Sequence, residues 1–139
     1  MSDEKKELQK RYVELQLIDA QVNQIQKQIQ LLDNQLMELD MINASLDDFG
    51  EIKAGTEILT SLAPGIYTKA ELKDNEELIV NVGSNVVVKK NISETKRMIN
   101  NQMDEMRKLQ EQVIAELNRL ILKANSIEQE INDIASKKE

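Results

Sequence analysis

A seven-residue repeat of apolar side chains runs through the first third of the chain, and it constrains the fold more than any other feature. A strict spacing of seven keeps two rows of side chains on one face of a helix that supercoils against a partner helix. The first row (position a) is Leu8, Leu15, Val22, Ile29, Leu36 and Asn43, and the second (position d) is Arg11, Ile18, Ile25, Leu32, Leu39 and Leu46. Residues 1–49 are therefore predicted to form a coiled-coil helix. Gly50 is expected to end it in the left-handed conformation that glycine adopts easily.

The last third of the chain repeats this pattern, with one apolar row and one that is more polar. The d residues are Ile92, Ile99, Met106, Val113, Leu120, Ile127 and Ile134, and the a residues are Lys96, Met103, Gln110, Leu117, Ala124 and Ile131. Asn91 is a candidate N-cap, with Glu94 three residues later as in a capping box. Residues 92–139 are therefore predicted to form a second coiled-coil helix, which folds back on the first and brings the two chain ends together.

Between the two helices, in residues 50–91, the apolar period changes from seven to two. Two turn signals, Pro64-Gly65 and Gly83-Ser84-Asn85, each separate a pair of segments with alternating polarity. The four segments are residues 57–63, 66–72, 78–82 and 86–88. The pattern predicts four short strands arranged as two β-hairpins, so the fold class is α+β and the whole chain is expected to be one structural domain.

Two hairpins are too small to bury a core of their own, and their exposed edges favour pairing with another chain. We therefore expect residues 50–91 to be an assembly platform that other subunits complete into a closed, oligomeric β-barrel or a stacked sheet. The apolar strand residues predicted to make these subunit contacts are Ile58, Leu62, Ile66, Leu72, Leu78, Val80, Val82, Val86 and Val88.

The composition argues against several classes of protein. The chain contains no Cys and no His, which removes the usual thiolate nucleophile, the commonest general base and the usual ligands of zinc. It has no Gly-rich phosphate loop with its lysine, so no ATP cycle is expected. The net charge of −7 is the wrong sign for binding nucleic acid, and no apolar run is long enough to span a membrane. We expect a cytoplasmic protein that is not an enzyme and uses no cofactor or metal.

The order helix, hairpins, helix, with repeats in both helices, resembles that of prefoldin over nearly the whole chain. The most specific resemblance lies in Glu-Ile-Leu at 57–59, Lys-Ala-Glu-Leu at 69–72 and Val-Gly-Ser-Asn-Val-Val-Val-Lys-Lys at 82–90. These segments are similar to the archaeal alpha subunits, which have two hairpins where beta subunits have one. Residues 60–64, Thr-Ser-Leu-Ala-Pro, depart from the strand end typical of the family.

The resemblance implies a hexamer of two alpha and four beta subunits, in which the hairpins form a double β-barrel and six coiled-coil arms surround a cavity. It also implies that the ends of the arms hold non-native client proteins and that these pass to a group II chaperonin. These properties come with the family and not from the repeat.

The expected client-binding surface lies near the chain ends, where a two-helix seam covers only part of each apolar side chain. The candidate residues are Leu8, Tyr12, Leu15, Ile127, Ile131 and Ile134. The alternative is that these residues only close the coiled coil. Arg11 and Gln110 interrupt the seam, either to set its register or to let its end open, whereas Met37, Met41 and Ile42 are expected to pack against the hairpins.

Two other functions compete with that of a chaperone. A filament-forming or scaffolding protein would use the same hairpins in an open polymer instead of a closed ring. A coiled-coil module that binds nucleic acid fits poorly with the acidic balance and with an aromatic content of only 2%, since single strands are held by stacking on aromatic side chains.

Overall fold

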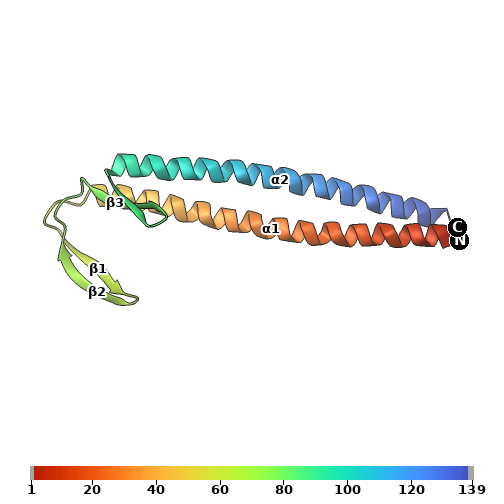
Figure 1. Ribbon diagram of the computed structural model, residues 1–139, viewed down its shortest axis with the longest axis horizontal. Helices are drawn as coiled ribbons and strands as arrows, with labels where there is room; N and C mark the ends of the chain where they lie inside the picture. The colour runs from red at the N-terminus through yellow and green to blue at the C-terminus, as the bar shows by residue number, and fades with distance from the viewer. Residues whose placement is uncertain (1, 138–139) are drawn as a thin grey trace. The chain divides into compact units, whose positions relative to one another are not determined.

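The computed structural model describes residues 2–137, so residues 1 and 138–139, at the outer ends of the two predicted helices, lie outside it. Six elements follow one another: α1 (Ser2–Gly50), β1 (Glu57–Ala63), β2 (Ile66–Glu71), β3 (Leu78–Gly83), β4 (Val86–Lys90) and α2 (Ile92–Ser136). α1 and α2 run in opposite directions (Figure 1). The prediction of two long antiparallel helices with two β-hairpins between them is confirmed.

The chain forms two compact units, and each long helix contributes to both. Unit 1 contains the described residues up to Gln35 and those from Met106 onward, whereas unit 2 is Leu36–Glu105. Among the described residues, unit 1 therefore consists of the N-terminal part of α1, the C-terminal part of α2 and the turn that follows α2. Unit 2 contains the remaining helix segments and both hairpins.

The core of unit 1 is the predicted seam between the two helices. Its buried residues are Ile18, Leu120, Ile127 and Ile131, and Leu8, Leu15, Val22, Ile25 and Ala124 pack against them. All the residues that the repeat assigns to positions a and d, in both helices, are buried or half-buried. Burial follows the repeat because these two positions of each heptad face the partner helix most directly.

Polar residues of the seam form hydrogen bonds and an ion pair with residues of the opposite helix. In unit 1, the Gln110 side-chain amide donates a hydrogen bond to the Asp33 carboxylate. In unit 2, Asn43 Nδ2 donates to Asn100 Oδ1 at 2.8 Å, and Lys96 forms an ion pair with Asp47. Each of these contacts requires one particular alignment of the helices, so together they favour a single register.

Arg11, which the repeat assigns to a d position, is the most unusual seam residue of unit 1. Its Nε lies 3.0 Å from Glu130 Oε2 on the opposite helix, and both of these atoms are buried. The contact is an ion pair without the alignment of a hydrogen bond. Glu14 and Glu7 of the same helix lie 3.5 and 3.8 Å from the guanidinium, so three carboxylates neutralise the one cation.

The end of α1 is capped by a residue that is distant in sequence. Gly50 belongs to the helix, and the glycines with positive φ are others, so the expectation that Gly50 ends α1 in the left-handed conformation is wrong. Asn75 Nδ2 instead donates to the carbonyls of Gly50 at 2.9 Å and Ile52 at 2.8 Å, which satisfies acceptors that a helix end leaves open. At the start of α2, Asn91 Oδ1 accepts from Glu94 N at 2.7 Å, which confirms the predicted N-cap.

The two hairpins of unit 2 are separate antiparallel sheets of two strands each. β1 pairs with β2 from Glu57↔Glu71 to Ala63↔Ile66, and β3 pairs with β4 from Leu78↔Lys90 to Gly83↔Val86, each with an irregularity beside the turn. At the second turn, Ser84 and Asn85 have φ of 51° and 62°. Positive φ at both central residues matches the twist of a two-residue hairpin, so both predicted hairpins are confirmed.

Leu120 provides a direct test of the seam. It is 3% exposed, whereas Leu122 on the outer face of the same helix is 70% exposed. Leu120→Ala should lower the free energy of unfolding by about 2–5 kcal/mol, because it removes a buried side chain and leaves a cavity. Leu122→Ala is the matched control and should change it by less than about 0.5 kcal/mol. Urea denaturation followed by circular dichroism measures both, and equal effects would contradict the seam.

The pair Arg11–Glu130 is expected to weaken the seam. Arg11→Met alone should destabilise the chain by about 1–3 kcal/mol, because it leaves the buried Glu130 oxygen unpaired. The double change Arg11→Met with Glu130→Met should restore or exceed the original stability, since apolar side chains often replace a buried ion pair without loss. A double-mutant cycle by denaturation measures the coupling, with Glu111→Gln, an exposed position away from the pair, as a surface control. A double variant no more stable than Arg11→Met would refute this expectation.

Candidate functional site

The described ends of α1 and α2 lie next to each other in unit 1 (Figure 1). The candidate client-binding residues come together there: Leu8 and Leu15 pack against a cluster that contains Ile127 and Ile131. Ile127 and Ile131 are buried, Leu8, Leu15 and Ile134 are half-buried, and Tyr12 is exposed. The Tyr12 side chain is therefore accessible in this arrangement, whereas Ile127 and Ile131 would become accessible only if the two helices separate.

Charges surround this group of residues. Ile134 lines a shallow surface hollow together with Glu7, Arg11, Glu130 and Asp133. The only basic side chain in the hollow is Arg11, which is already paired with carboxylates. An apolar ligand that reaches Ile134 therefore meets a rim with excess negative charge.

The outer surface of unit 1 carries one pair whose pKa values are shifted. Arg119 Nε donates to Glu116 Oε2 at 2.9 Å, and this hydrogen bond lowers the pKa of Glu116 and raises that of Arg119. The two residues are three positions apart on α2 and both are exposed. Because neither touches the candidate client-binding residues in any contact of the structure, the pair supports the helix locally and supplies no chemistry.

The hairpins present apolar residues on both faces. Of the predicted assembly residues, Leu72 is buried, Ile58, Leu78, Val80 and Val88 are half-buried, and Leu62, Ile66, Val82 and Val86 are exposed. In β3–β4, Val80 pairs with Val88 on one face, while Ile79 pairs with Lys89 on the other. Ile79 is 72% and its face neighbour Val87 is 60% exposed, and Leu59 and Tyr67 are similarly exposed in β1–β2.

The prediction from the sequence left out this second face, because it named only alternate residues of each strand as assembly residues. The signal was present, since Leu59, Tyr67, Ile79 and Val87 are all apolar. Apolar side chains on both faces of a strand are typical of strands covered on both sides. The platform therefore offers more apolar surface for contacts with other chains than the alternating pattern suggested.

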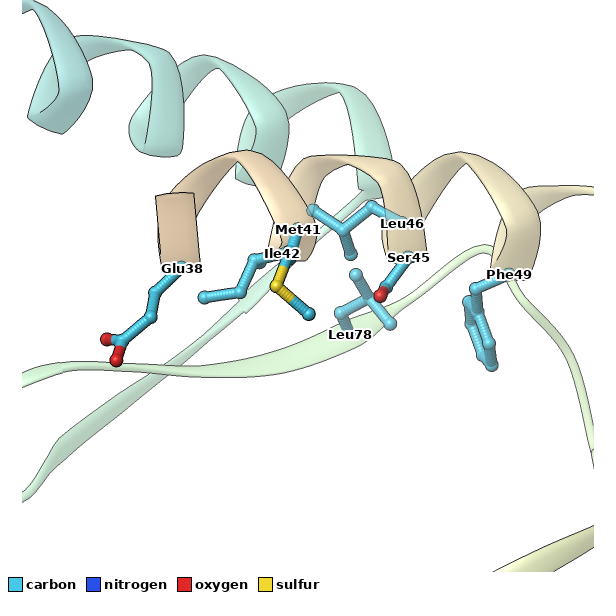
Figure 2. Close-up of a pocket in the computed structure, with 7 residues that line it drawn as sticks. All are labelled: Glu38, Met41, Ile42, Ser45, Leu46, Phe49 and Leu78. Atoms are coloured by element: carbon cyan, nitrogen blue, oxygen red, sulfur yellow. The ribbon is translucent and has the colours of Figure 1, made fainter. Parts of the chain in front are cut away.

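An apolar groove lies between α1 and β3 in unit 2 (Figure 2). Its floor contains Ile42, Leu46, Phe49 and Leu78. Met37, Met41 and Ile42 were expected to pack against the hairpins. Met41 and Ile42 line the groove with Leu78 of β3 but stay exposed, and Met37, which is also exposed, does not line it.

Two kinds of feature are missing from the part of the chain that the structure describes. No helix within residues 2–137 is both long and apolar enough to cross a membrane. No three or more His, Cys, Asp or Glu side chains gather there in an arrangement suited to a metal ion.

Comparison with known proteins identifies the family. The profile described as "Prefoldin subunit" matches residues 18–137. The "Prefoldin subunit alpha" of Thermofilum pendens is 31% identical over 113 residues, which cover 81% of this chain and 88% of that protein. The "Prefoldin subunit alpha" of Archaeoglobus fulgidus is 26% identical over 94% of this chain and 95% of its own length.

A solved structure agrees with the fold. The filamentous prefoldin of Methanocaldococcus jannaschii, determined by cryo-electron microscopy, superposes with a TM-score of 0.76 at 16% identity, covering 83% of this chain and 95% of that one. The fold of this chain, its two hairpins and the residues that the profile matches all indicate the same family. The chain therefore belongs to the prefoldin family of non-enzymatic chaperone subunits, and its two hairpins are those of the alpha class.

Proposed function

We propose that this chain is the alpha-type subunit of a cytoplasmic holdase, which binds non-native proteins without ATP, keeps them from aggregating and delivers them to a group II chaperonin. The complex we propose contains two alpha and four beta subunits. The observation that carries the proposal is the pair of hairpins whose apolar side chains remain in water in the single chain. A chain with this much uncovered apolar strand surface is expected to function only in an assembly.

Client binding is proposed for the region around Leu8, Tyr12, Leu15, Ile127, Ile131 and Ile134. Tyr12 is available in the closed seam, and Ile134 is half-covered. The ion pair Arg11–Glu130 supports opening of the seam at this level, because it replaces an apolar contact with a charged one. A weak contact on each of several arms would hold a client firmly through effective concentration and still release each arm easily.

Assembly is proposed to use the exposed strand residues Leu62, Ile66, Val82 and Val86 together with Leu59, Tyr67, Ile79 and Val87. The half-buried or buried Ile58, Leu72, Leu78, Val80 and Val88 would add to it only where the partner reaches them. Closure into a ring removes every open strand edge. The alternative is an open filament or scaffold, which the same uncovered edges favour and which is the filamentous form solved for the M. jannaschii protein.

Tyr12 and Ile134 test client binding. Covering a Tyr side chain with a client should contribute about 1–2 kcal/mol per arm. In complexes with a beta-type subunit, Tyr12→Ser and Ile134→Ser should therefore raise the concentration that halves aggregation of a denatured protein by about fivefold or more. Leu122→Ser, at a more exposed apolar position on α2, is the control and should have no effect. Light scattering measures aggregation, and variants that assemble normally and protect as well as the original would refute client binding here.

Ile79 tests assembly. Ile79→Glu places a charge in the proposed interface and should abolish the stable complex with a one-hairpin, beta-type subunit from the same cell. Leu122→Glu adds the same charge elsewhere and should leave the complex intact. Mass determination of the co-purified proteins decides between a complex of two long and four short chains and a polymer without a fixed mass. A complex that forms equally well with Ile79→Glu would exclude this face from the interface.

A further inference from the structure

The groove between α1 and β3 is an apolar hollow on the surface of unit 2. Met41, Ile42, Leu46 and Phe49 of α1 and Leu78 of β3 line it, with Glu38 and Ser45, and its volume is about 690 Å³. In Figure 2, Leu78 lies below α1 and faces Leu46 and Ser45, while Glu38 and Phe49 mark opposite ends of the row. The hollow is an open trough on the surface of unit 2 and not an enclosed cavity.

The position of these residues on α1 explains why the groove is free. Residues 38, 41, 42, 45 and 49 follow one another at spacings of three or four, so they share one face of the helix. The seam of unit 2 uses the neighbouring face, through Leu39 and Asn43. Of the described residues that line the groove, Leu78 of β3 alone comes from outside α1, and Met41 remains 68% exposed.

The charge around the groove selects the kind of ligand that it can hold. From Gln28 to Gly50, α1 has no Lys or Arg and five acidic residues, of which Asp33 and Asp47 pair across the seam. Among the described residues that line the groove, Glu38 is charged and none is basic, although Lys90 is the cross-strand partner of Leu78. An apolar floor with an acidic rim favours an apolar segment that carries positive charge beside it, because opposite charges steer and retain the ligand.

We propose that this groove is a second client-binding site, which takes an extended apolar segment of a non-native protein flanked by lysine or arginine. The inference deepens the proposed holdase function and rests on it. The exposed Met37 and Met41 suit such a role, since flexible, polarizable side chains adapt to many sequences. The volume lies within the range of about 300–1,000 Å³ typical of ligand pockets, which is enough for a few apolar side chains.

Strand pairing offers a reason why assembly can leave the groove open. Leu78 and Ile79 are consecutive in β3, so their side chains point to opposite faces of the hairpin. Leu78 belongs to the groove, whereas Ile79 and Val87 are exposed on the other face. Subunit contacts through Ile79 and Val87 would therefore leave the groove open. Val82 and Val86 share the face of Leu78, but they lie at the turn end of the hairpin and do not line the groove.

The test uses the assembled complex with its beta-type subunit and two fluorescent peptides. Both peptides have the same apolar centre of leucine, phenylalanine and valine. One peptide carries two lysines at each end, and the other carries two glutamates at each end. The variants are Glu38→Lys, which reverses the rim charge, and Met41→Ser, which removes part of the floor. The matched controls are Glu128→Lys and Leu122→Ser, exposed positions outside the groove. Fluorescence anisotropy gives Kd, and reaction of Met41→Cys with a thiol reagent reports whether the groove is covered.

The lysine peptide should bind about tenfold more tightly than the glutamate peptide, and this preference should decrease as salt rises. In a complex that also carries Tyr12→Ser and Ile134→Ser, which weaken the site near the chain ends, Glu38→Lys should abolish the preference and Met41→Ser should weaken both peptides by about threefold or more. The controls should change neither Kd. The lysine peptide should also protect Met41→Cys from the reagent. These results would support the site.

Two results would overturn the groove as a client site. One is a Met41→Cys thiol that is already protected in the complex without peptide, because a neighbouring subunit then occupies the groove. The other is equal binding of the lysine peptide to the original complex and to Glu38→Lys and Met41→Ser. If the original complex suppresses aggregation in either case, the groove fails while the holdase function stands. A complex that binds the lysine peptide at the groove but never suppresses aggregation would instead refute the holdase function.

Discussion

The apolar seam between α1 and α2 is the interaction on which the rest of the structure depends. The chain contains no Trp and one Phe, so aliphatic side chains such as Ile18, Leu120 and Ile127 provide the buried surface. Each contributes about 1.5–3 kcal/mol when it is buried, and the repeat supplies one at nearly every turn. Because the seam needs only two positions in seven, the other faces of both helices remain free for different tasks.

The seam combines this apolar stripe with polar contacts that have different consequences in the two units. In unit 2, Asn43–Asn100 and Lys96–Asp47 join the helices close to the hairpins in sequence. In unit 1, the ion pair Arg11–Glu130 replaces an apolar contact near the chain ends. Register contacts stabilise one alignment, whereas a partly buried ion pair adds little net stability. The same helical seam can thus be specific along its length and less stable where client binding is proposed.

The hairpins differ from the seam because many of their apolar side chains are exposed and not buried. Their strands have no partner helix on the Ile79 and Val87 face, so apolar surface stays exposed until another chain covers it. The face that contains Leu78 lies toward α1 and forms the groove of unit 2 (Figure 2). One hairpin can therefore serve assembly through its Ile79 and Val87 face and its turn, and ligand binding through Leu78, which is the basis of the two proposals for this unit. Family membership supports the chaperone role, whereas the assignment of each face is ours.

Much of the fold could be predicted because its signals are local. The repeat determined which residues of α1 and α2 are buried, since helix geometry alone brings positions a and d to one face. Turn chemistry determined the two hairpins: the residues of the second turn, Ser84 and Asn85, have the positive φ values that such a turn requires. Asn91 acts as an N-cap through the amide of Glu94, three residues away.

Features that depend on distant residues could not be read in the same way. Gly50 is a residue type that often ends a helix, but the Gly50 carbonyl at the end of α1 accepts a hydrogen bond from Asn75, which is 25 positions away in the sequence. The candidate site was located by its residues, yet only packing across the seam decided that Ile127 and Ile131 are buried while Tyr12 is exposed. The face of β3 that meets α1, and with it the groove, is set by how a strand docks on a helix. The sequence by itself determined the elements and the seam. The tertiary structure decided which apolar side chains remain in water, because that depends on which helix or strand packs against each face.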